Sequence, residues 1–325
     1  KTGSANVLTA AAVCGFLPQA ILGPFAGAWI DRISKKTIMI CADMFIATAT
    51  FFLFLSALAG DPPFWLILVV LTLRSVGSTF HAPALQAAIP LLVPKENISN
   101  AAGWMQFINA GANIGGPILG AALISVFDIS AALMVDIVGA IIASGCLLFV
   151  HIPHVKPEDP PQNILAEMAE GFREIMGNPI LKRMSIPMLV AVMFYMPLLS
   201  LFPLMISNHF HMTAWHSSFA QLLFGGGLLI SSLLIGIRGG LHNKFMQMSV
   251  SIVIMGGLLV ISGLLPSSGY VWFAILAAMM GFVGNIFYLA YISHIQTSFP
   301  PSVMGRVFAI ATSAISLATP FGLFV

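Results

Sequence analysis

Only 7% of the residues in this 325-residue chain are charged, so the side chains that could do acid–base chemistry are few. Arg74, Asp43 and Asp136 each fall inside a long apolar run. An ionised side chain in such a run needs an opposite charge or water beside it. These three residues therefore indicate either a site that moves protons or charged groups, or ion pairs that hold the structure together.

The positions of these residues within their runs favour different roles. Arg74 lies about 15 Å into its run, so we expect it to take part in coupling or in binding substrate charge, with an internal ion pair as the alternative. Asp43 and Asp136 lie about 9 Å inside their runs, from opposite ends, and are not expected to form one site. Each is a candidate proton site, although a structural pair or a helix cap explains each of them better.

A second set of candidates is neutral and suits a bulky amphipathic ligand. Amide and tyrosine side chains can adapt to such ligands, although helix packing or lipid contact explains each residue equally well. The set is Gln106, Asn109, Asn113, Tyr195, Gln221, Asn285, Tyr288 and Tyr291.

Other kinds of chemistry find little support. His209, His211 and His216 have ligand-like spacing, but no carboxylate or Cys accompanies them, so we expect an exposed polar loop and no metal. No phosphate-binding Gly-rich loop and no Ser, His and Asp grouping is present, so we expect no cofactor and no enzyme. A net charge of +2, with scattered basic residues, argues against nucleic acid.

The elements that position these residues must be membrane helices. The chain is 58% hydrophobic with a mean hydropathy of +0.98, and its apolar runs are about 20 residues long and continuous, as in membrane-spanning helices. We predict ten spans, at residues 5–30, 37–59, 64–86, 101–126, 130–151, 184–208, 214–238, 245–265, 270–293 and 303–325.

The order of the spans predicts two helix bundles, residues 1–151 and 184–325, joined by a linker at 152–183. The part of the linker from Ile164 to Met176 has helical apolar spacing and is expected to lie on the membrane surface. Of the 13 Lys and Arg residues, all but Lys1 and Arg74 fall on one side if the spans alternate. That side, which includes the linker, is therefore expected to be cytoplasmic.

Similar residues recur in the two halves and indicate that one bundle is a repeat of the other. Gln86 with Pro90 recurs as Gln296 with Pro300, and Lys35 recurs as Lys244, with nearly the same number of residues between the members of each pair.

The first cytoplasmic loop combines a glycine, an aspartate and basic residues at regular spacing. It reads Gly27-Ala-Trp-Ile-Asp31-Arg32-Ile-Ser-Lys35-Lys36 and resembles G-x-x-x-D-R-x-x-[RK]-[RK], a signature of the major facilitator superfamily. An ordinary basic cytoplasmic loop would explain the two lysines, but not the spacing of the glycine and the aspartate. The glycine permits close helix approach, and the aspartate can form charge-assisted bonds.

A second signature resembles the helix-bending element of antiporters in this superfamily. It consists of Gly111, Gly115, Gly116, Pro117 and Gly120, where small residues let helix backbones touch and the proline bends the helix. Generic helix packing is the alternative. The sequence departs from the family pattern after this element, at Ala121, where a second glycine is common.

Several further stretches resemble the branch that includes enterobactin exporters and macrolide efflux proteins. They are Thr2-Gly-Ser-Ala5, Phe16-Leu-Pro18-Gln19, Pro83-Ala84-x-Gln86-Ala87-Ala88-Ile-Pro90 and Pro301-x-x-x-Gly305-Arg306. The resemblance implies an all-α membrane protein of the major facilitator fold, with two pseudo-repeated bundles. It also implies that ten of twelve transmembrane helices are present, and that helices 1 and 12 are missing.

The function implied by the resemblance is secondary active export of a drug-like or siderophore-like amphipathic compound in exchange for protons. The protein is then a monomer in the bacterial inner membrane, in contact with lipid and a small-molecule substrate. A lipid or lysophospholipid flippase of the same fold, or a receptor or scaffold that transports nothing, are the alternatives.

One contact is predicted between residues far apart in the sequence. In the superfamily fold the cytoplasmic ends of helices 2 and 11 meet, which would place Asp31 beside Arg306 and beside the unpaired N–H groups that begin helix 11. We expect this contact to close the cytoplasmic side.

Overall fold

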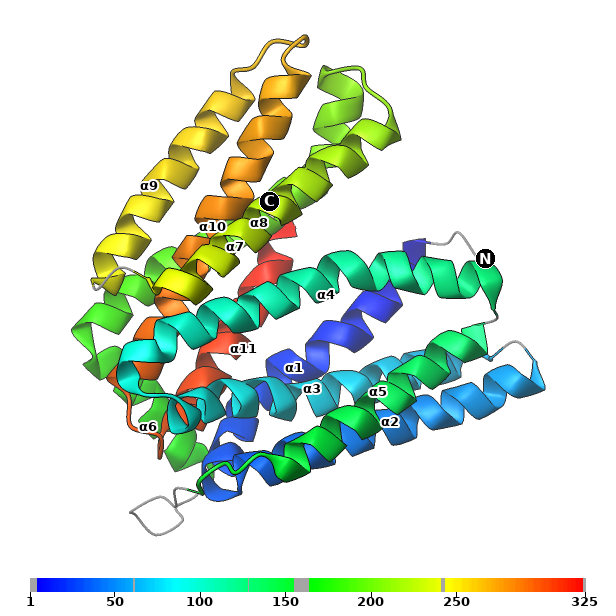
Figure 1. Cartoon of the computed structure of the whole chain (residues 1–325), viewed down its shortest axis with the longest axis vertical. Helices are drawn as coiled ribbons and strands as arrows, with labels where there is room; N and C mark the ends of the chain where they lie inside the picture. The colour runs from blue at the N-terminus through cyan, green and yellow to red at the C-terminus, as the bar shows by residue number, and fades with distance from the viewer. Residues whose placement is uncertain (1–4, 61, 128, 155–163, 241–242, 324–325) are drawn as a thin grey trace. The chain divides into compact units, whose positions relative to one another are not determined.

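The computed structural model describes residues 5–60, 62–127, 129–154, 164–240 and 243–323, and over these ranges it is helical with no strand. The helices are α1 (Ala5–Arg32), α2 (Lys35–Ala59), α3 (Phe64–Leu92), α4 (Ile98–Val126), α5 (Ile129–Phe149), α6 (Ile164–Gly177), α7 (Pro179–Leu204), α8 (Ala214–Arg238), α9 (Lys244–Gly263), α10 (Tyr270–Ser298) and α11 (Met304–Leu323). Two short turns, η1 (Lys95–Asn97) and the π-helical η2 (Met205–His209), precede α4 and follow α7. Figure 1 shows these helices in chain order by colour.

The ten predicted spans correspond to ten long helices, and the predicted amphipathic segment is α6. Several helices continue beyond the predicted apolar runs: α3 reaches Leu92 instead of residue 86, and α10 reaches Ser298 instead of residue 293. The reason is that hydropathy marks the edge of the hydrocarbon layer, whereas backbone hydrogen bonds continue a helix into the polar interface. Within the described residues, seven helices are long and apolar enough to cross a membrane.

Local signals set several helix ends. The Asn178 side chain accepts a hydrogen bond from the backbone N–H of Leu181 at 3.0 Å, in the first turn of α7, and Asn243 accepts one from Met246 at 3.0 Å in α9. Gly239 ends α8 with a φ of 75°, a conformation that glycine adopts without a steric penalty. These caps place the polar connections just beyond the apolar helix interiors.

The helices form two compact units. Unit 1 comprises Lys1–Leu92, Ile118–Met176 and Phe299–Leu317. Within it α3 packs on α1 and α2, and α2 packs on α5 (Figure 1). Unit 2 comprises Val93–Pro117, Gly177–Ser298 and Ala318–Val325, and within it α10 packs along α8 and α9.

Each unit takes residues from both sides of the linker at 152–183. Most of α11 lies in unit 1 with α1, and the first part of α4 lies in unit 2 with α8. Two contacts thus join helices from opposite sides of the linker, α1 with α11 and α4 with α8. Both contacts lie at helix ends that carry polar residues, which makes them candidates for a functional site.

Candidate functional site: two helix-end contacts and two polar pairs

The first helix-end contact joins Asp31, at the end of α1, to the first turn of α11. Asp31 Oδ1 accepts a hydrogen bond from the backbone N–H of Gly305 at 2.7 Å, and Oδ2 accepts one from the backbone N–H of Arg306 at 3.0 Å. The Arg306 Nε also donates to Oδ2, at 3.2 Å. We call this set of bonds the Asp31 latch. The contact predicted from the sequence is therefore present.

Because Asp31 and Arg306 are buried, the Asp31 latch is costly to break. Asp31 is 1% exposed and Arg306 is 6% exposed. A carboxylate at this depth is stable only while its hydrogen bonds and opposite charge are in place. It also meets the free N–H groups and the partial positive charge at the start of α11. Separation of the two helices therefore requires water or another partner to replace these contacts.

Two glycines allow the helices to come this close. A methyl group added at Gly27 would lie 2.5 Å from the Arg306 Cα, and one added at Gly305 would lie 2.5 Å from Asp31 Oδ1. Both distances are too short for real atoms. Gly27 of the loop signature and Gly305 of the stretch Pro301-x-x-x-Gly305-Arg306 thus lie where α1 and α11 touch, as the interpretation of Gly27 predicted.

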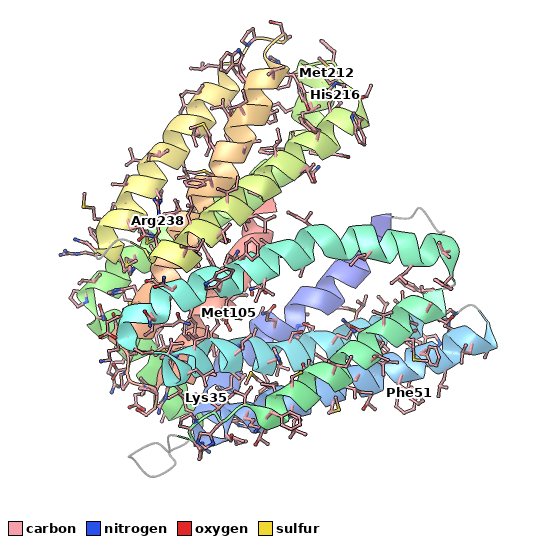
Figure 2. All side chains as sticks on the ribbon, viewed as in Figure 1. Lys35, Phe51, Met105, Met212, His216 and Arg238 are labelled. Carbon is pink, nitrogen blue, oxygen red and sulfur yellow. The ribbon has the colours of Figure 1, made fainter. Side chains whose placement is uncertain are left out.

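The basic residues of the same signature have separate positions. Lys35 begins α2 (Figure 2), is 3% exposed and interacts electrostatically with Asp31. Lys36 donates hydrogen bonds to the backbone carbonyls of Leu148 at 2.7 Å and Val150 at 3.0 Å, at the end of α5. Arg32 is half-buried. The signature therefore organises the ends of three helices in addition to binding α11.

Glu170 on α6 is a member of this site that was not predicted from the sequence. Its carboxylate pairs with Arg306 Nη1, so the guanidinium of Arg306 touches two acids. Arg306 is mostly buried and has five N–H donors, more than Asp31 can satisfy. That excess of donors is the signal that could have prompted a search for a second acid in the linker.

The second helix-end contact joins the first turn of α4 to the end of α8 and the start of α9, all within unit 2. The Asn100 side-chain amide donates to the backbone carbonyls of Gly236 at 3.1 Å and Ile237 at 3.3 Å, and Lys244 Nζ donates to Ser99 Oγ at 2.6 Å. Unlike the Asp31 latch, these bonds do not involve a carboxylate. Lys244 was predicted as the repeat counterpart of Lys35, whereas Ser99 and Asn100 were not predicted from the sequence.

Arg74 has a partner within unit 1. Its Nη1 pairs with Asp136 on α5 and donates to Thr50 Oγ1 on α2 at 2.9 Å, while Thr50 donates to Asp136 at 3.1 Å. The Arg74 and Asp136 side chains are each 39% exposed, and Thr50 is 1% exposed. The triad satisfies the charge of Arg74 and leaves part of both ionised groups accessible.

Asp43 on α2 pairs with His81 on α3, and not with Asp136. The Asp43 Oδ1 lies 3.4 Å from His81 Nε2, and the side chains are 17% and 28% exposed. His81 is seven residues after Arg74, and Asp43 is seven residues before Thr50. Seven residues are about two helical turns, or about 10 Å, so both polar pairs lie along one face of the α2–α3 contact.

The described residues leave the space beside the glycine element of α4 open. Methyl groups added at Gly111, Gly115, Gly116 and Gly120 would each meet no described atom within 4 Å. Close approach occurs earlier in α4, at Gly103 against Gly236 of α8, because the α4–α8 contact is tightest beside the Asn100 bonds. The side chain of Pro117 lies outside the described residues.

The neutral candidates divide by exposure. Asn109, Asn113 and Gln221 are exposed, and Gln106 and Tyr288 are half-buried.

The remaining neutral candidates are buried or lie outside the description. Asn285 is 4% exposed and donates to Ser231 and Ser232 of α8, each at 2.8 Å. Tyr291 is 3% exposed and bonds Ser185 of α7 at 3.1 Å. A ligand would reach these two side chains only if their helices moved. The side chain of Tyr195 lies outside the described residues.

The outer histidines do not converge. His209 Nε2 lies 2.8 Å from the backbone carbonyl of Leu265, and His216 Nδ1 lies 2.9 Å from Thr213 Oγ1. His216, labelled with Met212 in Figure 2, also receives a hydrogen bond at its carbonyl from Tyr270 at 2.9 Å. Among the described residues no group of three potential metal ligands is found. His209 and His216 instead make single polar contacts on either side of the turn between α7 and α8.

Comparison with known proteins agrees with this architecture. Residues 2–323 match the family model described as Major Facilitator Superfamily. Macrolide efflux protein A of Streptococcus pyogenes is 38% identical over 329 residues, covering 100% of this chain and 81% of that protein. Macrolide efflux protein A of Enterococcus faecalis is 38% identical over 325 residues, covering 99% and 100% respectively.

A solved structure shows the same fold. A bacterial homologue of the iron transporter ferroportin, crystallised in an outward-facing state, has a TM-score of 0.76 at 16% identity, covering 99% of this chain and 83% of that one. The family match extends over nearly the whole described chain, and the motif carrying Gly27 and Asp31 lies within it. The chain belongs to the Major Facilitator Superfamily of membrane transporters.

Proposed function

We propose that this transporter exports amphipathic compounds of the macrolide class from bacteria, in exchange for protons, by alternating access. The observation that carries the proposal is the 38% identity to Macrolide efflux protein A over the whole chain. We place the protein in the inner membrane, as a monomer, with the linker at 152–183 and the Asp31 latch on the cytoplasmic side, as the distribution of basic residues indicates.

The neutral candidates support a large and weakly charged substrate. Asn109 and Asn113 of α4 and Gln221 of α8 are exposed and belong to unit 2, and each offers both a donor and an acceptor. We assign substrate contact to these three side chains first. Gln106 and Tyr288 are half-buried and are assigned second.

The two polar pairs along α3 support proton exchange. Arg74 is an arginine with five N–H donors paired to Asp136, so this pair is suited to hold charge in place. Histidine is the side chain that most readily gains and loses a proton near neutral pH, so His81 with Asp43 is suited to carry one. We assign the proton to the His81–Asp43 pair and the positioning charge to the Arg74–Asp136 pair.

The helix-end contacts support the cycle itself. Both join a helix from one side of the linker to a helix from the other, and both consist of a few polar bonds beside a close glycine contact. Such contacts can be replaced by water without unfolding either helix. We assign closure of the cytoplasmic side to the Asp31 latch and to the Asn100 contact together.

The proposal is tested in bacteria that are sensitive to erythromycin, a macrolide, and that express the protein. Cells with the transporter should accumulate less radiolabelled erythromycin than cells with an empty vector, and a protonophore should remove the difference. An Arg74→Ala variant present in the membrane at the same level is the control for expression. Equal accumulation with and without the transporter would reject macrolide export.

A further inference from the structure

The linker helix α6 is seated on the first turns of α11. Glu170 pairs with Arg306, and a methyl group at Gly171 would lie 2.8 Å from Ile310 Cδ1 and 3.3 Å from the Arg306 Cβ. Ile175, one turn later on the same face of α6, is 5% exposed. The helix therefore contacts α11 through a buried face and not only through one ion pair.

Arg306 is shared between α1 and α6. Its Nε bonds Asp31 at 3.2 Å while its Nη1 bonds Glu170, and its side chain is 8% exposed. A guanidinium is a rigid planar fork, so fixing one edge fixes the direction of the other. The position of Glu170 therefore determines how Arg306 is presented to Asp31.

Glu170 places a negative charge beside a buried cation. Arg306 and Lys35 are both buried, and Asp31 is the one buried carboxylate among the described residues. An uncompensated buried charge is costly, and removing one partner of a buried pair costs more than the pair itself contributes. The Glu170 carboxylate supplies the second negative charge.

We propose that Glu170 is a positioning residue of the Asp31 latch, and that α6 is a third helix that must release Arg306 when α11 separates from α1. The linker then takes part in closing the cytoplasmic side and does more than connect two bundles. Because this role rests on the proposed alternating-access cycle, its test measures helix separation and not drug efflux.

The same helix offers a matched control. Glu174 lies one turn after Glu170 and is exposed, and no ion pair to it is found among the described residues. The Glu170→Gln and Glu174→Gln substitutions make the same chemical change in the same helix. Only the first removes a partner of Arg306.

A reporter for helix separation is available at Ser313, two turns after Arg306 on α11. Ser313 is 3% exposed, and a methyl group at Gly23 of α1 would overlap its Oγ, so the side chain lies in the α1–α11 contact. The native cysteines Cys14, Cys41 and Cys146 are replaced by serine, and Ser313→Cys is introduced. Its labelling rate is measured with a membrane-impermeant maleimide on inside-out membrane vesicles containing the whole protein.

Glu170→Gln should raise the labelling rate about 5-fold or more, within the range of typical coupling between sites, and Glu174→Gln should leave it unchanged. The Glu170→Gln effect should vanish when Arg306→Ala is also present, because the shared partner is gone. It should be smaller in Asp31→Asn, because the contact that Glu170 positions is already weakened there.

Three results would overturn the role of Glu170: an unchanged labelling rate, an equal rise with Glu174→Gln, or an undiminished rise in the Arg306→Ala background. Protein levels in the vesicles are measured for every variant, and Arg306→Ala serves as a second route to the same opening if Glu170→Gln expresses poorly. Erythromycin export is measured separately. If export is absent from every strain while labelling changes as expected, the proposed substrate is wrong and the role of Glu170 stands.

Discussion

The carboxylate of Asp31 accepts a backbone hydrogen bond from Arg306, a residue 275 positions later in the sequence, at 3.0 Å. The bond joins the end of one helix to the beginning of another, where backbone N–H groups have no partner within their own helix. A side chain that satisfies them ties the two helix ends together without altering either helix interior. This relationship gives the first prediction.

Asp31→Asn should favour separation of α1 from α11. The amide keeps one acceptor oxygen, but it loses the charge and turns an NH₂ group toward a backbone donor. We expect a loss of about 1–3 kcal/mol of closed-state stability, the usual coupling between sites, which is about 5- to 150-fold in the closed-to-open ratio. Cytoplasmic labelling of Ser313→Cys measures it, and a labelling rate equal to that of wild type would show that Asp31 organises only its own loop.

Arg306→Ala should open the same contact less than Asp31→Asn does. The backbone N–H groups of residues 305 and 306 remain to bond Asp31, and only the guanidinium bonds to Asp31 and Glu170 are lost. The comparison uses the same labelling assay. A larger effect for Arg306→Ala than for Asp31→Asn would mean that the side chain, and not the helix end, holds Asp31.

Gly27→Ala should impair export, because the added methyl group would lie 2.5 Å from the backbone of Arg306 and would force α11 away from α1. Gly145→Ala on α5 is the matched control in the same unit, since a methyl group there meets no described atom within 4 Å. Erythromycin accumulation should rise toward the empty-vector level only for Gly27→Ala. Equal behaviour of the two variants would contradict the close contact.

Arg74→Ala should abolish export while the protein still inserts into the membrane. The substitution leaves Asp136 without its cation in a half-exposed position within the helices, and the insertion machinery tolerates the loss of a buried charge. Membrane fractions are immunoblotted and accumulation is measured in the same cells. Export above half of the wild-type level would assign the pair with Asp136 to structure alone.

Asp43→Asn should abolish the pH-dependent part of export, because the amide can neither gain nor lose a proton and His81 then lacks its counter-charge. Asp43→Glu keeps the carboxylate and should retain the pH dependence. Export is measured across a series of external pH values for both variants and wild type. A wild-type pH profile for Asp43→Asn would move the proton site elsewhere, with Asp136 as the next candidate.

The sequence was sufficient to predict the helices and the contact between Asp31 and Arg306. Long apolar runs leave the backbone no alternative to helix in a bilayer, and the resemblance to the superfamily placed the ends of α1 and α11 together. The spacing of Gly27 and Asp31 also carried a physical meaning of its own, because a glycine and an acid one turn apart can face the same neighbouring helix.

Partners between segments were harder to predict. Asp43 and Asp136 were recognised as candidates, but their pairing with His81 and Arg74 depends on how three helices are rotated about their axes, which hydropathy alone does not fix. Glu170 is one of several charged residues in the linker, and nothing in the sequence distinguishes it from its neighbours. The role of the glycines from Gly111 to Gly120 stays a prediction, and the close approach described for α4 lies at Gly103. A small residue permits close approach but does not require it.

The most direct test of proton-coupled export is erythromycin uptake into inside-out membrane vesicles under an imposed pH gradient. An acidic lumen should drive accumulation of radiolabelled erythromycin in vesicles with the transporter, and collapse of the gradient should release it. Vesicles carrying Asp43→Asn should accumulate no more than vesicles without the protein. Accumulation that is the same with and without the gradient, or with and without the transporter, would contradict the account.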